Sequence, residues 1–110
     1  MRSSFDRALG PTEGPYSDTQ FLVLASLAAG PKHGHAMLED MEQMCGARPG
    51  PGTLYGAIAR LEQQGLIEPL AAEDRRRPYR LTQAGQRAFT AKLKTLQRIV
   101  RFGTRRLAPA

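Results

Sequence analysis

Three consecutive arginines, Arg75, Arg76 and Arg77, are the residues of this sequence best suited to bind an anion. Their like charges repel one another, so we expect them at the surface, where the guanidinium forks match the geometry of a phosphate. Glu73 and Asp74 stand directly before them and reduce the local charge. Taken alone, the run is also compatible with a solvated turn that has no partner.

A second group of contact residues lies in the segment GPGTLYGAIARLEQQGLI, residues 50–67. Pro51 suits the first position of a helix, and Gly50 and Gly52 let the backbone approach a partner closely. At about 100° per residue, one face is apolar and is expected in the core: Leu54, Ala57, Ile58 and Leu61. The opposite face is small, aromatic or cationic: Thr53, Tyr55, Gly56, Ala59, Arg60 and Gln63.

These two groups together predict an interface with double-stranded DNA. A helix that enters the major groove points its first turn at the phosphates, and an arginine-bearing hairpin beside it can reach the backbone or the minor groove. The expected DNA contacts are Thr53, Tyr55, Gly56 and Arg60 in the helix and Arg75, Arg76, Arg77 and Arg80 in the hairpin.

The composition agrees with an anionic partner. The chain has 110 residues, enough for one domain, and a net charge of +6. Its single cysteine, Cys45, excludes an internal disulfide, and its longest apolar run, residues 21–29, is about half the ~20 residues needed to cross a bilayer. We therefore expect a cytoplasmic protein without a membrane partner.

The elements that must position these residues follow from periodicity and breakers. Residues 1–17 are rich in Gly, Pro and Ser and are expected to form a flexible N-terminal arm. Helices are predicted from Ser17 or Asp18 to about Ala29, from Gly34 or His35 to Cys45, from the turn at 47–52 to about Gln64, and from Thr82 or Gln83 to Leu107. Two short strands, 66–70 and 79–82, form a hairpin in which Pro69 must lie at an edge or an end.

This order predicts a mainly α (α+β) fold: a winged helix-turn-helix over residues 18–82, followed by a dimerisation helix and tail over 83–110. In the last helix, apolar residues recur at alternating spacings of four and three, as in a helix that packs along a partner helix. The expected dimer contacts are Phe89, Leu93, Leu96, Val100 and Leu107, together with Phe21 of the first helix. The alternative is that this helix folds back onto its own domain.

Other residues that could do chemistry give weaker signals. His33 and His35 lack the third and fourth ligands that a metal site needs, so we expect surface residues beside Lys32, near the DNA backbone. Met37, Met41, Met44 and Cys45 fall on an apolar stripe and are expected in the core, with a redox-sensing role for Cys45 as the alternative. No catalytic spacing is present, and we expect neither an enzyme nor a cofactor.

The segments GTLYGAIARLEQQGLIE, DRRRPYRLTQAG and GHAMLEDM closely resemble the PadR family of bacterial transcriptional regulators. The resemblance covers about residues 21–88 and implies a homodimer that binds a pseudo-palindromic operator, usually as a repressor released by a small-molecule effector or a stress signal. Two features depart from the family: Pro78 stands where the wing usually has an aromatic residue, and the chain has no Trp on which a flat ligand could stack. A winged-helix module that binds proteins without specific DNA binding is the alternative.

Overall fold

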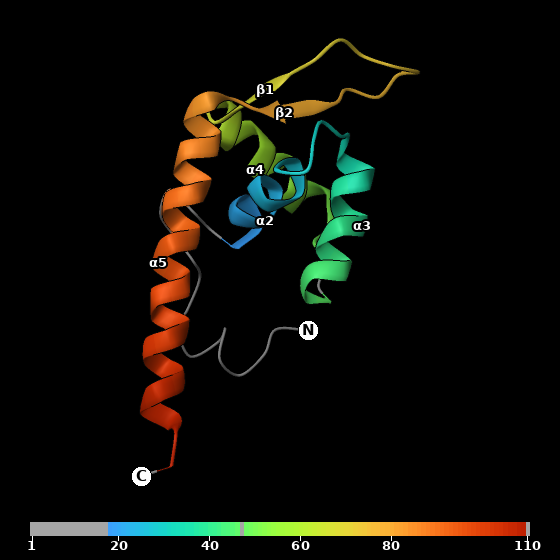
Figure 1. Ribbon diagram of the computed structural model, residues 1–110. Helices are drawn as coiled ribbons and strands as arrows, with labels where there is room; N and C mark the ends of the chain where they lie inside the picture. The colour runs from blue at the N-terminus through green and yellow to red at the C-terminus, as the bar shows by residue number, and fades with distance from the viewer. Residues whose placement is uncertain (1–17, 47, 110) are drawn as a thin grey trace.

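The computed structural model describes residues 18–46 and 48–109, so the arm predicted for residues 1–17 lies outside the described residues. The described chain forms four helices and one two-stranded sheet (Figure 1): α2 (Asp18–Leu27), α3 (Gly34–Cys45), α4 (Pro51–Gln63), β1 (Ile67–Pro69), β2 (Tyr79–Leu81) and α5 (Gln83–Leu107). This is the winged helix-turn-helix with a long last helix that the sequence predicts. Within the described residues, none of the helices is long and apolar enough to cross a bilayer.

The helix ends follow from local backbone chemistry. Gly46 ends α3 in the left-handed conformation, φ 72°, and its N–H donates to the carbonyl of Glu42 at 2.8 Å. Pro51 occupies the first turn of α4, and the hydroxyl of Thr82 caps α5 by accepting from Gly85 N at 3.0 Å. The first helix ends at Leu27, two residues before the predicted Ala29, because a tight turn follows in which Gly30 N donates to Leu27 O at 3.0 Å.

The core gathers around α2, whose Val23 and Leu24 are fully buried. It joins α2 to α3, to the apolar face of α4 and to β1 through ten buried apolar side chains: Val23, Leu24, Leu27, Met37, Met41, Leu54, Ala57, Ile58, Leu61 and Ile67. The predicted core face of α4 is therefore confirmed at all four positions.

The expectation that Met44 and Cys45 belong to the core is wrong. Met44 is 45% exposed and Cys45 is exposed, although both continue the helical spacing of Met37 and Met41. The last turn of α3 extends past the elements that cover its first two turns (Figure 1). The apolar side chains of that turn therefore have no neighbouring helix to pack against. Cys45 Sγ instead donates to the carbonyl of Met41 at 3.4 Å.

The two strands are antiparallel, with Ile67 opposite Leu81, Glu68 opposite Arg80 and Pro69 opposite Tyr79. Pro69 lies at the end of its strand, as expected. Lys32, in the loop between α2 and α3, adds a third segment: its backbone N–H donates to Tyr79 O at 3.2 Å and its carbonyl accepts from Tyr79 N at 3.1 Å. This pairing of distant segments holds the base of the wing (β1, β2 and the loop between them) against the start of α3.

The first turns of α5 are locked to the segment between α4 and β1. Thr82 Oγ1 donates to Gly65 O at 2.6 Å, and a Cβ added at Gly85 would lie 1.9 Å from Leu66 O, so only glycine fits there. Farther along, the ring of Phe89 lies 5.3 Å from that of Phe21. Phe21 and Phe89 thus pack against each other within one chain, whereas the second half of α5 projects beyond the domain (Figure 1).

A polar cluster joins α2, α3 and the loop between them. The hydroxyl of buried Ser26 donates to Asp40 Oδ2 at 2.7 Å, and Lys32 forms an ion pair with the same oxygen. The hydrogen bond from Lys32, with a smaller one from Ser26, lowers the pKa of Asp40 below its ordinary value of 3.8. Asp40 and Lys32 thus hold two helices and the base of the wing together.

We predict that Asp40→Asn lowers the free energy of unfolding by about 1–2 kcal/mol at pH 7, since a charge-assisted bond at a partly exposed site is lost. The folded-state pKa is depressed, so the contribution of Asp40 is present above pH 3.8 and is lost as the pH falls through the lower folded value. Urea unfolding at pH 7 and pH 3 measures both effects. Glu39→Gln, which neutralises an exposed carboxylate on the same helix, is the control; equal stability of both variants contradicts the prediction.

Candidate nucleic-acid interface

The wing ends in a two-residue turn whose central residues are Asp74 and Arg75, with φ of 47° and 66°. The N–H groups and carbonyls of Glu73 and Arg76 exchange two hydrogen bonds of 2.7 Å across it. Positive φ at both central positions is the geometry of a type I′ turn, which matches the twist of a hairpin. The turn places Arg75 at the tip of the wing, and Arg75 has no hydrogen bond or ion pair with the described residues.

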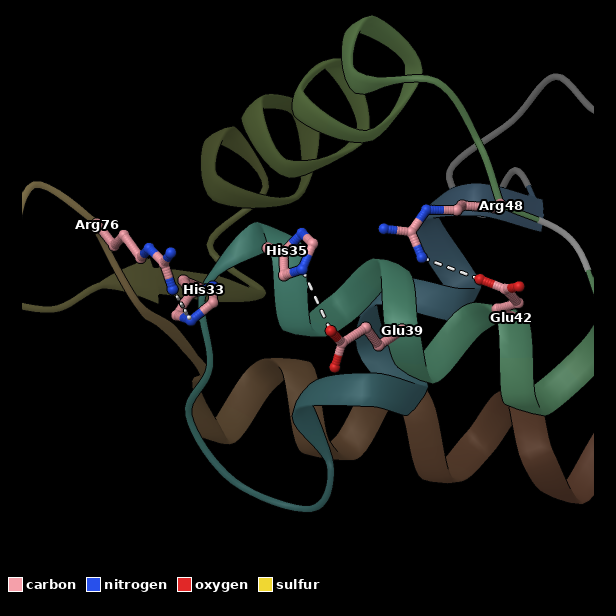
Figure 2. A network of polar contacts seen from close by, with 6 residues as sticks. All are labelled: His33, His35, Glu39, Glu42, Arg48 and Arg76. Atoms are coloured by element: carbon pink, nitrogen blue, oxygen red, sulfur yellow. Dashed lines mark hydrogen bonds and ion pairs between the residues drawn. The ribbon is translucent and has the colours of Figure 1, made fainter.

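The next two arginines point in different directions. Arg76 reaches back toward the loop before α3, where its Nη1 lies 3.4 Å from Nε2 of His33 (Figure 2). Arg77 donates from Nη1 to Leu70 O at 3.2 Å, which ties it to the opposite side of the wing. All three arginines are exposed, as expected, but each has a different environment.

Tyr55 extends from the first half of α4 across the start of α3, and its side chain is 55% exposed. A Cβ added at Gly34 would lie 2.8 Å from the Tyr55 hydroxyl oxygen and 3.2 Å from ring carbon Cζ. Gly34 therefore provides the space in which the Tyr55 ring lies. This gives a physical reason for glycine in the GHAMLEDM segment: the side chain on the neighbouring helix needs the room.

These elements enclose a hollow of about 430 Å³ between the wing, α4 and the start of α3. It brings together four of the predicted DNA contacts and four further residues: Tyr55, Arg75, Arg76, Arg77, His33, Gly34, His35 and Tyr79. Its lining contains three guanidinium groups and two phenol hydroxyls but no carboxylate, so its polar chemistry favours an anion.

His33 and His35 lie at the surface beside this hollow, with their rings 6.5 Å apart. His35 also pairs with Glu39 one turn along α3, Nε2 to Oε1 3.2 Å (Figure 2). Among residues 18–46 and 48–109, no three His, Cys, Asp or Glu side chains converge as they would around a metal ion.

Three predicted contacts on α4 lie outside the hollow, although they are exposed. Thr53, Gly56 and Arg60 are on the solvent face of the helix, opposite the buried Leu54 and Leu61. The first turn of α4 has no side-chain cap and no acidic residue, so its free N–H groups and positive helix dipole are available to an anion.

Arg80 is the predicted contact of the hairpin that lies outside the hollow. Side chains alternate along a strand, so Arg80 points to the side of the wing opposite Tyr79. Its Nε donates to Glu68 Oε1 at 2.6 Å, and it lines a different hollow together with Phe89 and Leu93 of α5. We therefore leave Arg80 out of the interface. The same alternation places Tyr79, which is not among the predicted contacts, in the hollow.

Comparison with known proteins agrees with this architecture. The sequence profile of the Transcriptional regulator PadR-like family matches residues 23–91. A Streptomyces fradiae protein of transposon TN4556, described as uncharacterized, is 46% identical over 83 residues, 76% of this chain but 24% of its own length. The chain thus spans about a quarter of that relative.

A relative of more similar size is the transcriptional regulator Rv3488 of Mycobacterium tuberculosis, 35% identical over 72% of this chain and 76% of its own length. Among solved structures, a PadR family transcription regulator from Clostridium difficile superposes with a TM-score of 0.71 over 82% of this chain and 98% of its own, at 20% identity. This last likeness concerns the fold.

We predict that Gly34→Ala displaces the Tyr55 ring and lowers the free energy of unfolding by no more than about 1 kcal/mol, because the new methyl group meets the end of a half-exposed side chain that can shift. Adding Tyr55→Ala should recover most of that loss in a double-mutant cycle measured by urea unfolding. Gly52→Ala is the matched control, since nothing lies within 4 Å of its added Cβ. A Gly34→Ala protein as stable as the parent would show that Tyr55 does not need this space.

Proposed function

This chain belongs to the PadR-like family of transcriptional regulators, and on that premise we propose that it represses transcription by binding a pseudo-palindromic operator as a homodimer. In this proposal the first turn of α4 enters the major groove, with Thr53, Tyr55 and Arg60 toward the DNA. Arg75 and Arg76 of the wing contact the flanking backbone. The observation that carries the proposal is the carboxylate-free hollow between Tyr55 and the arginine wing.

The second half of α5 supports the homodimer. It leaves large apolar side chains in water: Val100 is 64% exposed and Leu107 is 87% exposed, with Leu93 at 36%. Burying such a side chain contributes roughly 1.5–3 kcal/mol, and a second copy of the same helix offers a matching surface. Phe21 and Phe89 would support the dimer indirectly, because their contact with each other fixes α5 to its own domain. They would not themselves contact the partner chain.

Release from the operator by a small molecule or a stress signal is the remaining part of the proposal. A hollow of about 460 Å³ between α2, β2 and α5 supports it. Its lining is mostly apolar, with Leu27, Leu81, Phe89 and Leu93 beside Arg80 and Gln86. A molecule in this position would contact the proposed dimer helix and the wing strand at once.

We predict that Arg60→Ala with Arg76→Ala weakens operator binding at least tenfold, equivalent to about 1.4 kcal/mol. The operator is first selected from a random duplex pool, and affinity is then measured by gel shift between 50 and 200 mM salt. If six to ten phosphates are contacted per dimer, the parent should lose about 10³–10⁵-fold over that range.

The control for this experiment is Arg48→Ala with Arg80→Ala, which removes the same charge but takes nothing from the interface. Arg48 pairs with Glu42 on α3 at 2.9 Å, and Arg80 pairs with Glu68. The protein would more simply be a protein-binding module if the Arg60 and Arg76 variant bound the operator as tightly as the parent. The same holds if the operator affinity of the parent did not change with salt concentration.

We predict that Val100→Glu converts the dimer into a monomer at micromolar concentration, because it places a charge in the apolar stripe. Sedimentation equilibrium measures the mass directly. Thr95→Glu adds the same charge to an exposed site on α5 outside the stripe and should leave the dimer intact. A parent chain that sediments as a monomer contradicts the homodimer.

A further inference from the structure

The positive charge of this chain is concentrated in α5. The helix contains seven Lys and Arg residues and no Asp or Glu. The whole chain has sixteen basic and ten acidic residues, so the part outside α5 has nine basic and ten acidic residues. The net charge of +6 therefore does not come from the wing and α4; the excess is carried by α5.

Five of the seven charges share one face of the helix. At about 100° per residue, the α5 cationic stripe falls within about 60° and consists of Arg87, Lys94, Arg98, Arg101 and Arg105. The stripe runs over nineteen residues, and the eighteen steps from the first to the last rise about 27 Å along the axis. The apolar residues Leu96, Val100 and Leu107 lie on the far side of the helix, so a dimer closed through them leaves the stripe uncovered.

No carboxylate among residues 18–46 and 48–109 pairs with the stripe. Within the described residues, its five side chains form no ion pair, whereas Lys32, Arg48 and Arg80 each have a carboxylate partner. Like charges three and four residues apart, such as Lys94 with Arg98, destabilise a helix. A polyanion laid along the stripe would remove this repulsion.

The surface along the first half of the stripe is hollowed and polar. A shallow depression of about 470 Å³ is lined by Gln83, Gln86, Arg87, Thr90, Ala91 and Lys94. Amide, hydroxyl and cationic groups in this lining can all donate hydrogen bonds to phosphate oxygens, and the lining has no carboxylate to repel them.

The stripe faces away from the domain. Gly85 and Phe89, which pack on Leu66 and Phe21, lie on the opposite side of α5. The stripe is thus turned away from the surface that α5 packs on, and we expect a duplex held by the wing and α4 to leave it uncovered. We propose that the α5 cationic stripe binds the phosphate backbone of a second DNA segment, so that the regulator bridges two duplexes; the first of these contacts rests on the proposed function.

Duplex DNA fits the stripe better than a lipid surface does. The cations recur about once per one or two helix turns in a line, and each DNA strand offers a phosphate every 3.4 Å along its axis. One border of the stripe is polar and includes Thr90, Gln97 and Thr104. Beyond the other border Phe102 and Ile99 are exposed, and Arg106 lies over the Phe102 ring; these two residues sit near one end of the stripe, whereas an interfacial helix needs bulky apolar groups along its whole length. Binding through phosphates alone makes the second contact independent of sequence.

The test uses the full chain, an operator duplex with one dye and a random-sequence duplex with a second dye. In the parent protein, energy transfer should report both duplexes on one assembly. The triple variant Lys94→Gln, Arg98→Gln and Arg101→Gln should keep its operator affinity and lose the transfer. Its affinity for the random duplex should depend less on salt, with the log–log slope reduced by about 2.7 for three lost phosphate contacts.

Arg48→Gln with Lys92→Gln and Arg106→Gln is the matched control, since it removes three charges outside the stripe and should bridge like the parent. The variant with Arg60→Ala and Arg76→Ala separates the two proposals. It should no longer bind the operator more tightly than the random duplex, but it should still bind the random duplex through the stripe. Neutralising the stripe as well should abolish that remaining binding. Bridging that survives neutralisation of the stripe overturns the inference. Stripe-dependent binding to phosphatidylserine vesicles without binding to the random duplex overturns it as well.

Discussion

Burial of apolar side chains around α2 is the interaction on which the other parts of this structure depend. Val23, Leu24 and Leu27 fill the space between α3, α4 and β1, and the same packing turns the opposite face of α4 to the solvent. The core is small: it covers the first half of α5 through Phe89 and no more. The limited core thus accounts for two features together, an exposed helix face beside the wing and an uncovered helix beyond the domain.

The sequence predicts what periodicity and breakers determine. The four buried positions of α4, its start at Pro51, the end of α3 at Gly46 and the start of α5 after Thr82 all follow from spacing and local backbone chemistry. Met44 and Cys45 show the limit of this reasoning, because an apolar stripe reveals which face is buried but not where the covering element stops. The Lys32–Tyr79 pairing depends on a contact between distant segments, which no local pattern encodes.

Much of the candidate site can also be predicted from local sequence patterns. The arginines of the wing and the exposed face of α4 are recognisable as a pair of cationic or polar surfaces, whereas the role of Gly34 depends on where Tyr55 lies in three dimensions. The net charge of the chain is a misleading guide to the candidate site. It agrees with an anionic partner, but the excess positive charge lies in α5 and not in the hollow between the wing and α4. Arg80 belongs to the arginine-rich segment but faces the other way because strands alternate.

The contact between Gly85 and Leu66 O sets the direction in which α5 leaves the domain. The Thr82 bonds to Gly65 and Gly85 stiffen the same point, so α5 leaves the domain as a rigid arm in a fixed direction. In a pair of copies joined through these arms, the fixed direction of α5 would also set the separation of the two α4 helices. In the proposed dimer, recognition of half-sites ~34–36 Å apart would then depend on a joint far from any base pair.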